Sequence, residues 1–265
     1  MKRIALVVAA STAIAPAPTT AAASSENDHT TTNLADLDLD LSGLPTEPQT
    51  FDLRMHGKSY DRGAPFPLET TLTLQTAYEG SRIVFNDTLD FMGRRFAFHL
   101  VCEPRPTLPL DHAEVRMEHS ARSLCATAVR DPDADTITIT TSAGATTTTP
   151  FPDDTITQAA LLRIVTRLPR TPGRTYRFSA YCPLSKLEPA TPDSEPHCTL
   201  TCRGRTTTKI DGRPVECTEY VANFEGALTL LVDDDATLRK IIAYHAQTEM
   251  VLVPADAALA EARDE

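Results

Sequence analysis

The feature that most constrains the fold is a two-residue alternation of apolar and polar side chains, which recurs in short runs. It is most regular between Gly173 and Val253, where segments such as RTYRFSAYCP, HCTLTCRG and GALTLLVDDDATLRKIIAY follow one another. Alternation places one face of a strand in a core and the other in water. Asp211-Gly212 lies between two of these runs and is a strong hairpin signal, because both residues tolerate positive φ. This segment is therefore predicted to be a β-meander.

The same alternation recurs through the first half of the chain. Turn signals such as Glu79-Gly80-Ser81 and Asp131-Pro132-Asp133 separate the runs. The fold class expected from this pattern is mainly β. Strands are expected over residues 68–78, 82–92, 96–102, 123–129 and 136–140, and around Val115 and Met117.

One segment departs from the two-residue period. In DDTITQAALLRIVTRLP the apolar residues recur at the i, i+3, i+4 and i+7 positions of a helix, with Arg163 among the polar residues opposite. We expect one amphipathic helix at about 154–168, packed on the concave face of a curved antiparallel sheet or half-open barrel. The side chains expected between helix and sheet, either lining an apolar cavity or filling a core, are Leu161, Ile164, Val165, Leu168, Tyr176 and Phe178.

The N-terminus carries the pattern of a secretory signal peptide. Lys2 and Arg3 precede a short apolar stretch and Ala21-Ala22-Ala23, which predicts cleavage near Ala23. No apolar stretch reaches the ~20 residues that cross a bilayer, so no transmembrane segment is expected. The protein is predicted to be exported to the periplasm or the extracellular space. The predicted divisions are a signal peptide at 1–23, a disordered acidic and Thr-rich spacer at 24–50, one β-rich domain at 51–254 and a C-terminal tail at 255–265.

Charge and motifs argue against several classes of function. The formal net charge is −11, whereas a nucleic-acid partner requires clustered Lys and Arg. The sequence contains no G-x-S-x-G, no Gly-rich phosphate loop and no H-E-x-x-H. We therefore expect no nucleic-acid partner, no cofactor, no metal site and no catalytic residue.

Two polar clusters have structural interpretations that compete with a metal site. His112, Glu114, Glu118 and His119 would lie near one another on a helix, but on a strand His112, Glu114 and Glu118 form its wet face, which fits the neighbouring pattern better. Asp233-Asp234-Asp235 lacks the alternate acids, the central Gly and the terminal Glu of a calcium loop. We expect it to be the acidic turn between two strands.

The six cysteines permit up to three disulfides in an exported protein, and the sequence leaves fifteen complete pairings open. If residues 176–182 and 198–204 pair as a hairpin, Cys182 and Cys198 lie opposite each other, and this is the disulfide we expect first. Cys102 and Cys125 are the second candidate pair. Buried free thiols are the alternative, and the spacing disfavours zinc.

A set of turn-and-strand motifs lies between Leu161 and Val253. They are a lone helix ending in LP, then PGRTYRFSAYCP, a strand ending in RGR, the hairpin DGRPVE, LLVDDDATLRKI and EMVLVP. In these motifs the chain resembles exported bacterial domains of unknown function that are similar to half-open β-barrels, some of which stand upstream of a transglutaminase-like domain. The resemblance implies a sheet wrapped around a helix and a hint of apolar-ligand binding. We expect no catalytic domain, because the chain stops at Glu265.

Three functions remain open from the sequence. The first is an exported non-enzymatic module that binds a lipophilic molecule or a cell-envelope partner between helix and sheet. The second is a structural or interaction domain with a filled core. The third is an enzyme that uses a cysteine or the His/Glu cluster, which lacks a supporting signature. The expected partner is an apolar small molecule or an envelope protein.

Overall fold

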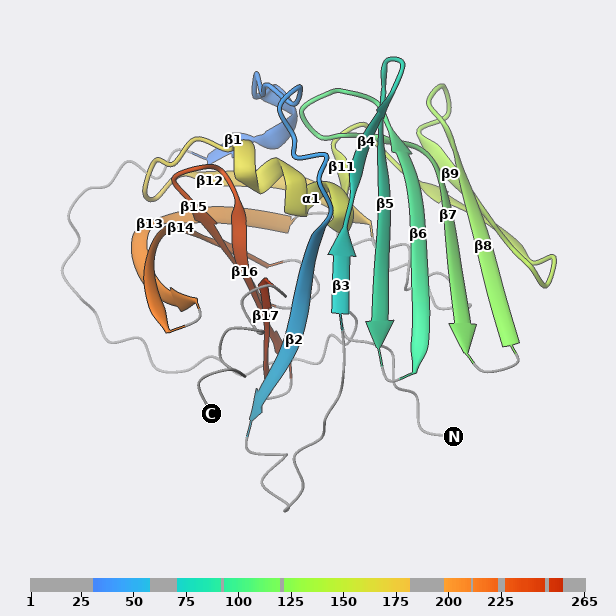
Figure 1. Ribbon diagram of the computed structural model, residues 1–265. Coiled ribbons are helices and arrows are strands. Elements are labelled where there is room, and N and C mark those ends of the chain that lie inside the picture. The colour runs from blue at the N-terminus through green and yellow to red at the C-terminus, as the bar shows by residue number, and fades with distance from the viewer. Residues whose placement is uncertain are drawn as a thin grey trace, which may run out of the picture.

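The computed structural model describes residues 31–57, 71–91, 93–119, 122–181, 198–210, 212–223, 227–245 and 248–254. Here the chain is mainly β, as predicted, and a strongly curved, unclosed sheet surrounds one short α-helix (Figure 1). The strands are β1 (Thr31–Asn33), β2 (Gln49–Gly57), β3 (Thr71–Leu74), β4 (Thr76–Glu79), β5 (Arg82–Phe91), β6 (Arg94–Cys102), β7 (Leu110–His119), β8 (Arg122–Asp131), β9 (Thr136–Thr141), β10 (Thr146–Pro150), β11 (Thr155–Thr157), β12 (Thr175–Tyr181), β13 (Cys198–Ile210), β14 (Arg213–Ala222), β15 (Ala227–Asp233), β16 (Leu238–His245) and β17 (Thr248–Pro254). The helical elements are α1 (Gln158–Ile164) and the 3₁₀ turns η1 (Leu34–Asp36) and η3 (Val165–Arg167).

Two antiparallel meanders make up the sheet. One runs from β12 to β17 and the other from β5 to β10, each strand pairing with the next. Strand β2 joins them, because it pairs with β17 on one side and with β3 on the other, and β3 pairs with β5. The early part of the chain and the C-terminal meander therefore share one curved sheet.

The hairpin predicted at Asp211-Gly212 is present. Ile210 pairs directly with Arg213, which leaves a two-residue connection between β13 and β14. Gly212 has a φ of 71°, in the left-handed region that favours glycine. The local turn chemistry therefore fixes the register of this pair of strands.

The helix is shorter than predicted and begins later. Residues Thr155–Thr157 form β11, which pairs in parallel with β12, so the chain enters the helix from a strand. Thr157 caps the helix, since its hydroxyl accepts a hydrogen bond from the Ala160 amide at 3.1 Å. Asp153 lies before β11 and pairs with Arg105. The parallel pairing of β11 with β12 satisfies backbone groups that a helix beginning at residue 154 would leave open.

Helix α1 is buried from Ala160 to Ile164, on its polar as well as its apolar side, which corrects its predicted amphipathic character. Arg163 is 4% exposed and Thr166 8% exposed, although the periodicity assigned both to a solvent face. The curved sheet passes around the helix rather than lying beneath it, so the polar side also faces protein (Figure 1). The six side chains predicted to lie between helix and sheet are all buried in one continuous core cluster: Leu161, Ile164, Val165, Leu168, Tyr176 and Phe178.

The segment predicted to be a disordered spacer is, from Thr31 onward, part of the fold. Strand β1 pairs in parallel with β12, and Leu34, Leu41 and Leu44 are buried in the main core. Tyr78 holds the segment, because its hydroxyl donates to the Leu41 carbonyl at 2.8 Å and accepts from the Leu44 amide at 3.1 Å. Alternating Leu and Asp suits a strap with one face on a core and one in water. The predicted signal peptide and C-terminal tail lie outside the described residues.

This strap, residues 31–44, yields a stability prediction. Replacing Leu41, which is 5% exposed, in the variant Leu41→Ala should lower the free energy of unfolding by about 2–5 kcal/mol, because a buried leucine leaves a cavity. The exposed neighbour Asp38 is the control, and Asp38→Ala should change stability by no more than about 0.5 kcal/mol. Urea denaturation measures both. Equal stability of Leu41→Ala and the wild type would mean that the strap is detached in solution.

Candidate functional site

Rows of directly paired residues cross the inner face of the sheet. Phe85, Leu100, Ala113 and Ala128 are paired in register on β5, β6, β7 and β8, and all four are buried in the main core. Because alternate residues of a strand share a face, every second residue from these positions also belongs to the inner face. This register is the frame on which the candidate site is built.

A buried ion pair joins the helix to this inner face. Both guanidinium NH groups of Arg163 on α1 contact the Asp87 carboxylate on β5, at 2.8 and 2.5 Å. The two side chains are only 5% and 6% exposed. A two-point contact of this kind fixes both the distance and the orientation of its partners. The ion pair therefore sets the depth at which the helix lies within the curved sheet.

Neighbouring groups satisfy most of the remaining polar atoms of this pair. Arg163 also donates to the carbonyl oxygens of Ala159 and Gln75, at 3.2 and 3.3 Å, and its guanidinium lies 4.4 Å from the Phe85 ring centre. Asp87 accepts a hydrogen bond from the Gln75 amide at 3.1 Å. Gln75 is the residue between β3 and β4, so the interruption of that strand supplies the backbone groups that surround the ion pair.

An apolar row crosses the inner face on the side of the ion pair away from Phe85. It consists of residues paired directly across six neighbouring strands, two positions beyond Asp87 on β5. We call it the inner apolar row. Its members, from β2 to β8, are Phe51, Leu72, Leu89, Phe96, Met117 and Leu124.

The inner apolar row is most exposed at its β8 end. Phe51 is 1% exposed and Phe96 7%, whereas Met117 is half-buried and Leu124 is 44% exposed. Leu89 and Phe96 form a small cluster of their own, distinct from the main core around the helix. In Figure 1 the strands β5 to β8 extend well below α1, and this is the part of the sheet that carries the row. The inner face below the helix is therefore apolar and partly open toward β8.

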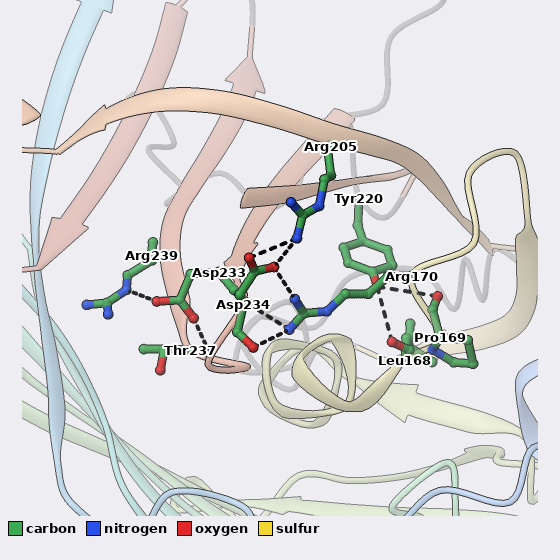
Figure 2. Close-up of polar contacts among 9 residues, drawn as sticks. All are labelled: Leu168, Pro169, Arg170, Arg205, Tyr220, Asp233, Asp234, Thr237 and Arg239. Carbon is green, nitrogen blue, oxygen red and sulfur yellow. Dashed lines mark hydrogen bonds and ion pairs between the residues drawn. The ribbon is translucent and has the colours of Figure 1, made fainter. Parts of the chain in front are cut away.

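The C-terminal end of the helical segment is anchored on the opposite meander. The hydroxyl of Tyr176 donates to the Pro169 carbonyl at 3.0 Å. The hydroxyl of Tyr220 donates to the Leu168 carbonyl at 3.2 Å (Figure 2). Burial raises the pKa of Tyr176 to about 12 and raises the pKa of Tyr220 as well. Both hydroxyls therefore remain protonated donors throughout the neutral range.

Two aspartates of the predicted acidic turn, Asp233 and Asp234, contact arginines. Arg205 and Arg170 both contact the Asp234 carboxylate, at 2.7 and 3.0 Å, and Arg239 contacts Asp233 at 2.5 Å (Figure 2). The Thr237 amide donates to Asp233, which closes the turn between β15 and β16. Arg170 follows Pro169, so these contacts also hold the end of the helical segment. The prediction of an acidic turn is confirmed, and the carboxylates of Asp233 and Asp234 serve as partners for arginine.

The second polar cluster lies on a strand, as its neighbouring pattern indicated. His112, Glu114 and Glu118 all fall within β7 and are exposed or half-buried. Glu114 pairs with Arg116 at 2.8 Å, and His112 lies 3.6 Å from Asp111. Within the described part of the chain, no group of three or more His, Cys, Asp or Glu side chains is placed to hold a metal ion.

The register corrects the geometry behind the first predicted disulfide. Phe178, not Cys182, lies opposite Cys198 in the β12–β13 pair. The pairing of β12 with β13 is therefore shifted by four residues from the expected one. Cys182 itself lies outside the described residues, so a bond between Cys182 and Cys198 stays a prediction.

The second predicted disulfide is not formed. Cys102 and Cys125 are both free thiols. Cys102 is buried at the end of β6 beside Leu110, whereas Cys125 on β8 pairs with Arg116 across from the middle of β7. The two thiols are thus separated along the strands and lie on opposite faces of the sheet.

Burial also affects the acidity of the thiols. It is the main cause that raises the pKa of Cys102, Cys125, Cys202 and Cys217, and the nearby Glu114 carboxylate adds to the rise at Cys125. A raised pKa keeps a cysteine in the thiol form, which is a poor nucleophile. These four side chains therefore have the character of structural cysteines.

From the sequence, the candidate ligand-binding side chains were expected around the helix, and the inner apolar row was missed. The alternation identified Leu72, Phe96 and Met117 as apolar strand positions, but nothing local showed that they are in register with one another. The six side chains expected between helix and sheet are buried in the main core. Only knowledge of the strand register from β3 to β8 could have identified the inner apolar row from the sequence.

Comparison with protein families and with curated proteins finds no match. Among solved structures, the crystal structure of a β-barrel-like protein of a domain of unknown function, DUF1849, from Brucella abortus is similar. The likeness covers 78% of this chain and 94% of that chain, with 7% sequence identity and a TM-score of 0.48. That neighbour is a barrel-like domain without an assigned function, and the expected association with transglutaminase-like domains finds no support in it. In the described residues, no helix is long and apolar enough to cross a membrane.

The buried ion pair gives a prediction about stability. Asp87→Ala should lower the free energy of unfolding by about 3–5 kcal/mol, because it leaves the Arg163 guanidinium buried without its counter-charge. The double variant Asp87→Leu/Arg163→Met should recover much of that loss, since both charges are removed together. Arg205→Ala, at an exposed ion pair, is the control and should cost no more than about 1 kcal/mol. A double variant as unstable as Asp87→Ala, or more so, would contradict this account.

The tyrosine anchors give a prediction about alkaline pH. Tyr176 has an ordinary pKa of about 10 in the unfolded chain and a pKa of about 12 in the fold. Its contribution is therefore fully present below pH 10 and is lost as the pH rises from about 10 to about 12, because only the unfolded chain releases the proton there. Urea denaturation at pH 8, 10 and 11.5 should show a smaller fall for Tyr176→Phe than for the wild type. Parallel pH profiles would contradict the assignment.

Proposed function

We propose that the protein is an exported, non-enzymatic module that binds a lipophilic molecule on the inner apolar row. The observation that carries the proposal is the exposure of Leu124, which is 44% exposed and continues a row of buried apolar residues on the concave face. Large apolar side chains on a concave surface are typical of a ligand site. The ligand would cover the half-buried Leu72 and Met117 as well.

The position of the helix directs the ligand to this part of the molecule. The side chains of α1 and η3 are closely packed in the main core, and the Arg163–Asp87 ion pair lies at its lower boundary. Below that boundary the inner face carries the smaller cluster of Leu89 and Phe96. The proposed ligand site therefore lies beneath the helix rather than between the helix and the upper sheet, where the sequence analysis expected either a cavity or a filled core.

The chemical character of the cysteines and of the acidic turn favours binding over catalysis. The thiol pKa values of four cysteines are raised by burial, and Asp233 and Asp234 are engaged by arginines. Neither arrangement provides an activated nucleophile with an adjacent base. Export is supported by the Lys2-Arg3 start and the Ala21-Ala22-Ala23 motif of the sequence.

A second candidate is a structural or interaction domain without a ligand. The continuous packing around the helix favours it, because most of the interior is a filled core. The two candidates differ at the inner apolar row, which would be closed by a partner protein in one case and by a small molecule in the other. Pull-down from envelope extracts with the row variants below distinguishes them.

Native mass spectrometry of protein purified from its own host should reveal a bound lipophilic molecule, and the emptied protein should take up Nile red. Leu124→Asp should weaken Nile red binding by about tenfold, since burying a leucine contributes about 1.5–3 kcal/mol and a factor of ten is 1.4 kcal/mol.

Val129→Asp is the matched control for this experiment. Val129 is 58% exposed and lies on the same strand, β8, but its side chain is on the outer face of the sheet. It should leave dye binding unchanged. A clean apo mass together with no dye uptake would overturn the proposed function, and an equal loss in both variants would mean that the dye binds non-specifically.

A further inference from the structure

The two ends of the curved sheet differ in how their edges are covered. Along β12, residues 175–177 pair with β1 and residues 179–181 pair with β11, so both halves of that strand have a neighbour. At the other end of the sheet, β10 pairs with β9, and no second partner strand is found among the described residues. Thr146, Thr147 and Thr148 of β10 are exposed. We call the unpaired side of β10 the bare edge.

Backbone hydrogen bonds fix both ends of the β9–β10 pair. At one end the Thr141 amide donates to the Ala145 carbonyl at 2.9 Å, and at the other the Phe151 amide donates to the Asp135 carbonyl at 2.6 Å. Bonded and non-bonded pairs alternate in an antiparallel ladder. The two bonds are an even number of residues apart along β9, as this alternation requires, so every second pair between them is bonded as well.

The alternation decides which backbone groups of β10 point away from β9. Counted from the bonded ends, Thr147 and Thr149 direct their N–H and C=O groups toward β9, whereas Thr146 and Thr148 direct theirs outward. The side chains agree, because the Thr148 hydroxyl lies 3.1 Å from that of Thr138, and non-bonded pairs bring side chains close together. The bare edge therefore presents two N–H donors and two C=O acceptors to a further strand.

The bare edge lacks the features that commonly protect such a strand. Strand β9 reads TITITT and β10 reads TTTTP, so neither carries a charge, although 23% of the chain is charged. Their register is continuous, without a β-bulge. Proteins commonly blunt an exposed edge with charged side chains, prolines or bulges, and here only Pro150, at the end of β10, does so. An uncharged, regular edge of β-branched residues is a template for pairing with another strand.

We propose that the bare edge binds a second copy of this chain, with β10 pairing antiparallel to the partner's β10 about a twofold axis at Thr147. In this register Thr146 faces the partner's Thr148, and Thr148 faces the partner's Thr146. Two outward donors from each copy then make four backbone hydrogen bonds, and every outward N–H and C=O group of these residues is bonded. This inference goes beyond the proposed function and does not depend on it.

The ends of β10 favour this register over its neighbour. Pro150 has no N–H group and would lie opposite the partner's Gly144, whose own N–H is already bound to the Thr141 carbonyl at 2.8 Å. Pairing therefore stops there without an open donor. An axis at Thr148 would instead place Thr146 opposite the partner's Pro150, which cannot donate to the Thr146 carbonyl.

The distribution of charge favours two antiparallel copies. The connection from β8 to β9 carries Asp131, Asp133 and Asp135, all exposed, next to the Pro150 end of β10. The turn at 142–144, at the other end of β10, is uncharged. Antiparallel pairing places each acidic connection beside the partner's uncharged turn. The two Pro150 ends are six residues apart along the shared ladder, or about 20 Å, more than twice the ~8 Å Debye length at physiological ionic strength.

The twofold arrangement also limits the assembly to two copies. It uses the bare edge of both molecules, and a self-complementary interface of this kind closes on itself. Five residues of β10 from each copy make a small interface. The expected dimer is therefore weak, and its population depends on protein concentration.

Sedimentation velocity of the full-length protein, from micromolar to millimolar concentration, should show monomers passing into dimers. Thr148→Pro should weaken this association by at least about tenfold, because each copy loses one of its two outward N–H donors. Proline is tolerated there, since an edge strand accepts it where the N–H group faces solvent. The thermal transition of each variant confirms that it folds.

A pair of lysine variants separates the edge from general charge effects. Thr147→Lys places two ammonium groups at the axis and should weaken dimerisation by at least about tenfold. Thr127→Lys is the matched control, because Thr127 is exposed on β8, two strands from the bare edge. Both variants change the net charge by the same amount, so Thr127→Lys should associate at least as strongly as the wild type.

A cross-linking experiment tests the position of the axis. The two Thr147 residues would form a non-bonded pair with Cα atoms about 4.5 Å apart, within the range that a disulfide spans. Thr147→Cys should therefore give a covalent dimer under mild oxidation. The wild type, with its own cysteines, and Thr127→Cys should not. More efficient cross-linking by Thr148→Cys would overturn the proposed axis.

Three results would overturn the proposal. The first is a protein that stays monomeric at millimolar concentration, with no cross-link from Thr147→Cys. The second is a dimer that Thr147→Lys leaves intact, because the interface would then lie elsewhere. The third is a monomeric protein that pulls down an envelope protein which Thr147→Lys loses, since the bare edge would then belong to a strand of another protein.

Discussion

The buried ion pair between Arg163 and Asp87 is the interaction on which the arrangement of helix and sheet depends. Two charges at 5% and 6% exposure are tolerated only because they meet at two points and because backbone groups of Gln75 and Ala159 complete the network. Moving the helix along or away from β5 would leave both charges buried and unpaired, at a cost of several kcal/mol. The ion pair thus specifies one position for the helix where apolar packing alone would permit several.

The ion pair also divides the inner face into two regions. Above it, the helix, the strap and both meanders share one core. Below it, the inner apolar row runs from Phe51, which still belongs to that core, across six strands and becomes exposed at Leu124. The residues of the inner apolar row come from separate strands, so their alignment depends on the register of the sheet.

Anchors at several points keep the helical segment in place around this pair. Thr157 caps its start, Tyr176 and Tyr220 bind the carbonyls at its end, and Arg170 contacts the turn at Asp234. The exposed ion pairs of that turn contribute little individually, but they close the end of the β15–β16 hairpin against the residues that follow the helix. The features that looked most like an active site, the acidic turn and the cysteines, are explained by this architecture.

The sequence by itself determined the mainly β fold, the Asp211-Gly212 hairpin and the existence of one helix, because alternation, turn residues and a 3.6-residue period are local properties of the chain. It also indicated that His112 and Glu114 lie on a strand. The tertiary structure alone decided that Arg163 is buried, that residues 31–44 form a strap, and that Phe178 lies opposite Cys198. It likewise decided that Phe96, Met117 and Leu124 form one row. Register and burial depend on contacts between residues far apart in the chain, and no local pattern records them.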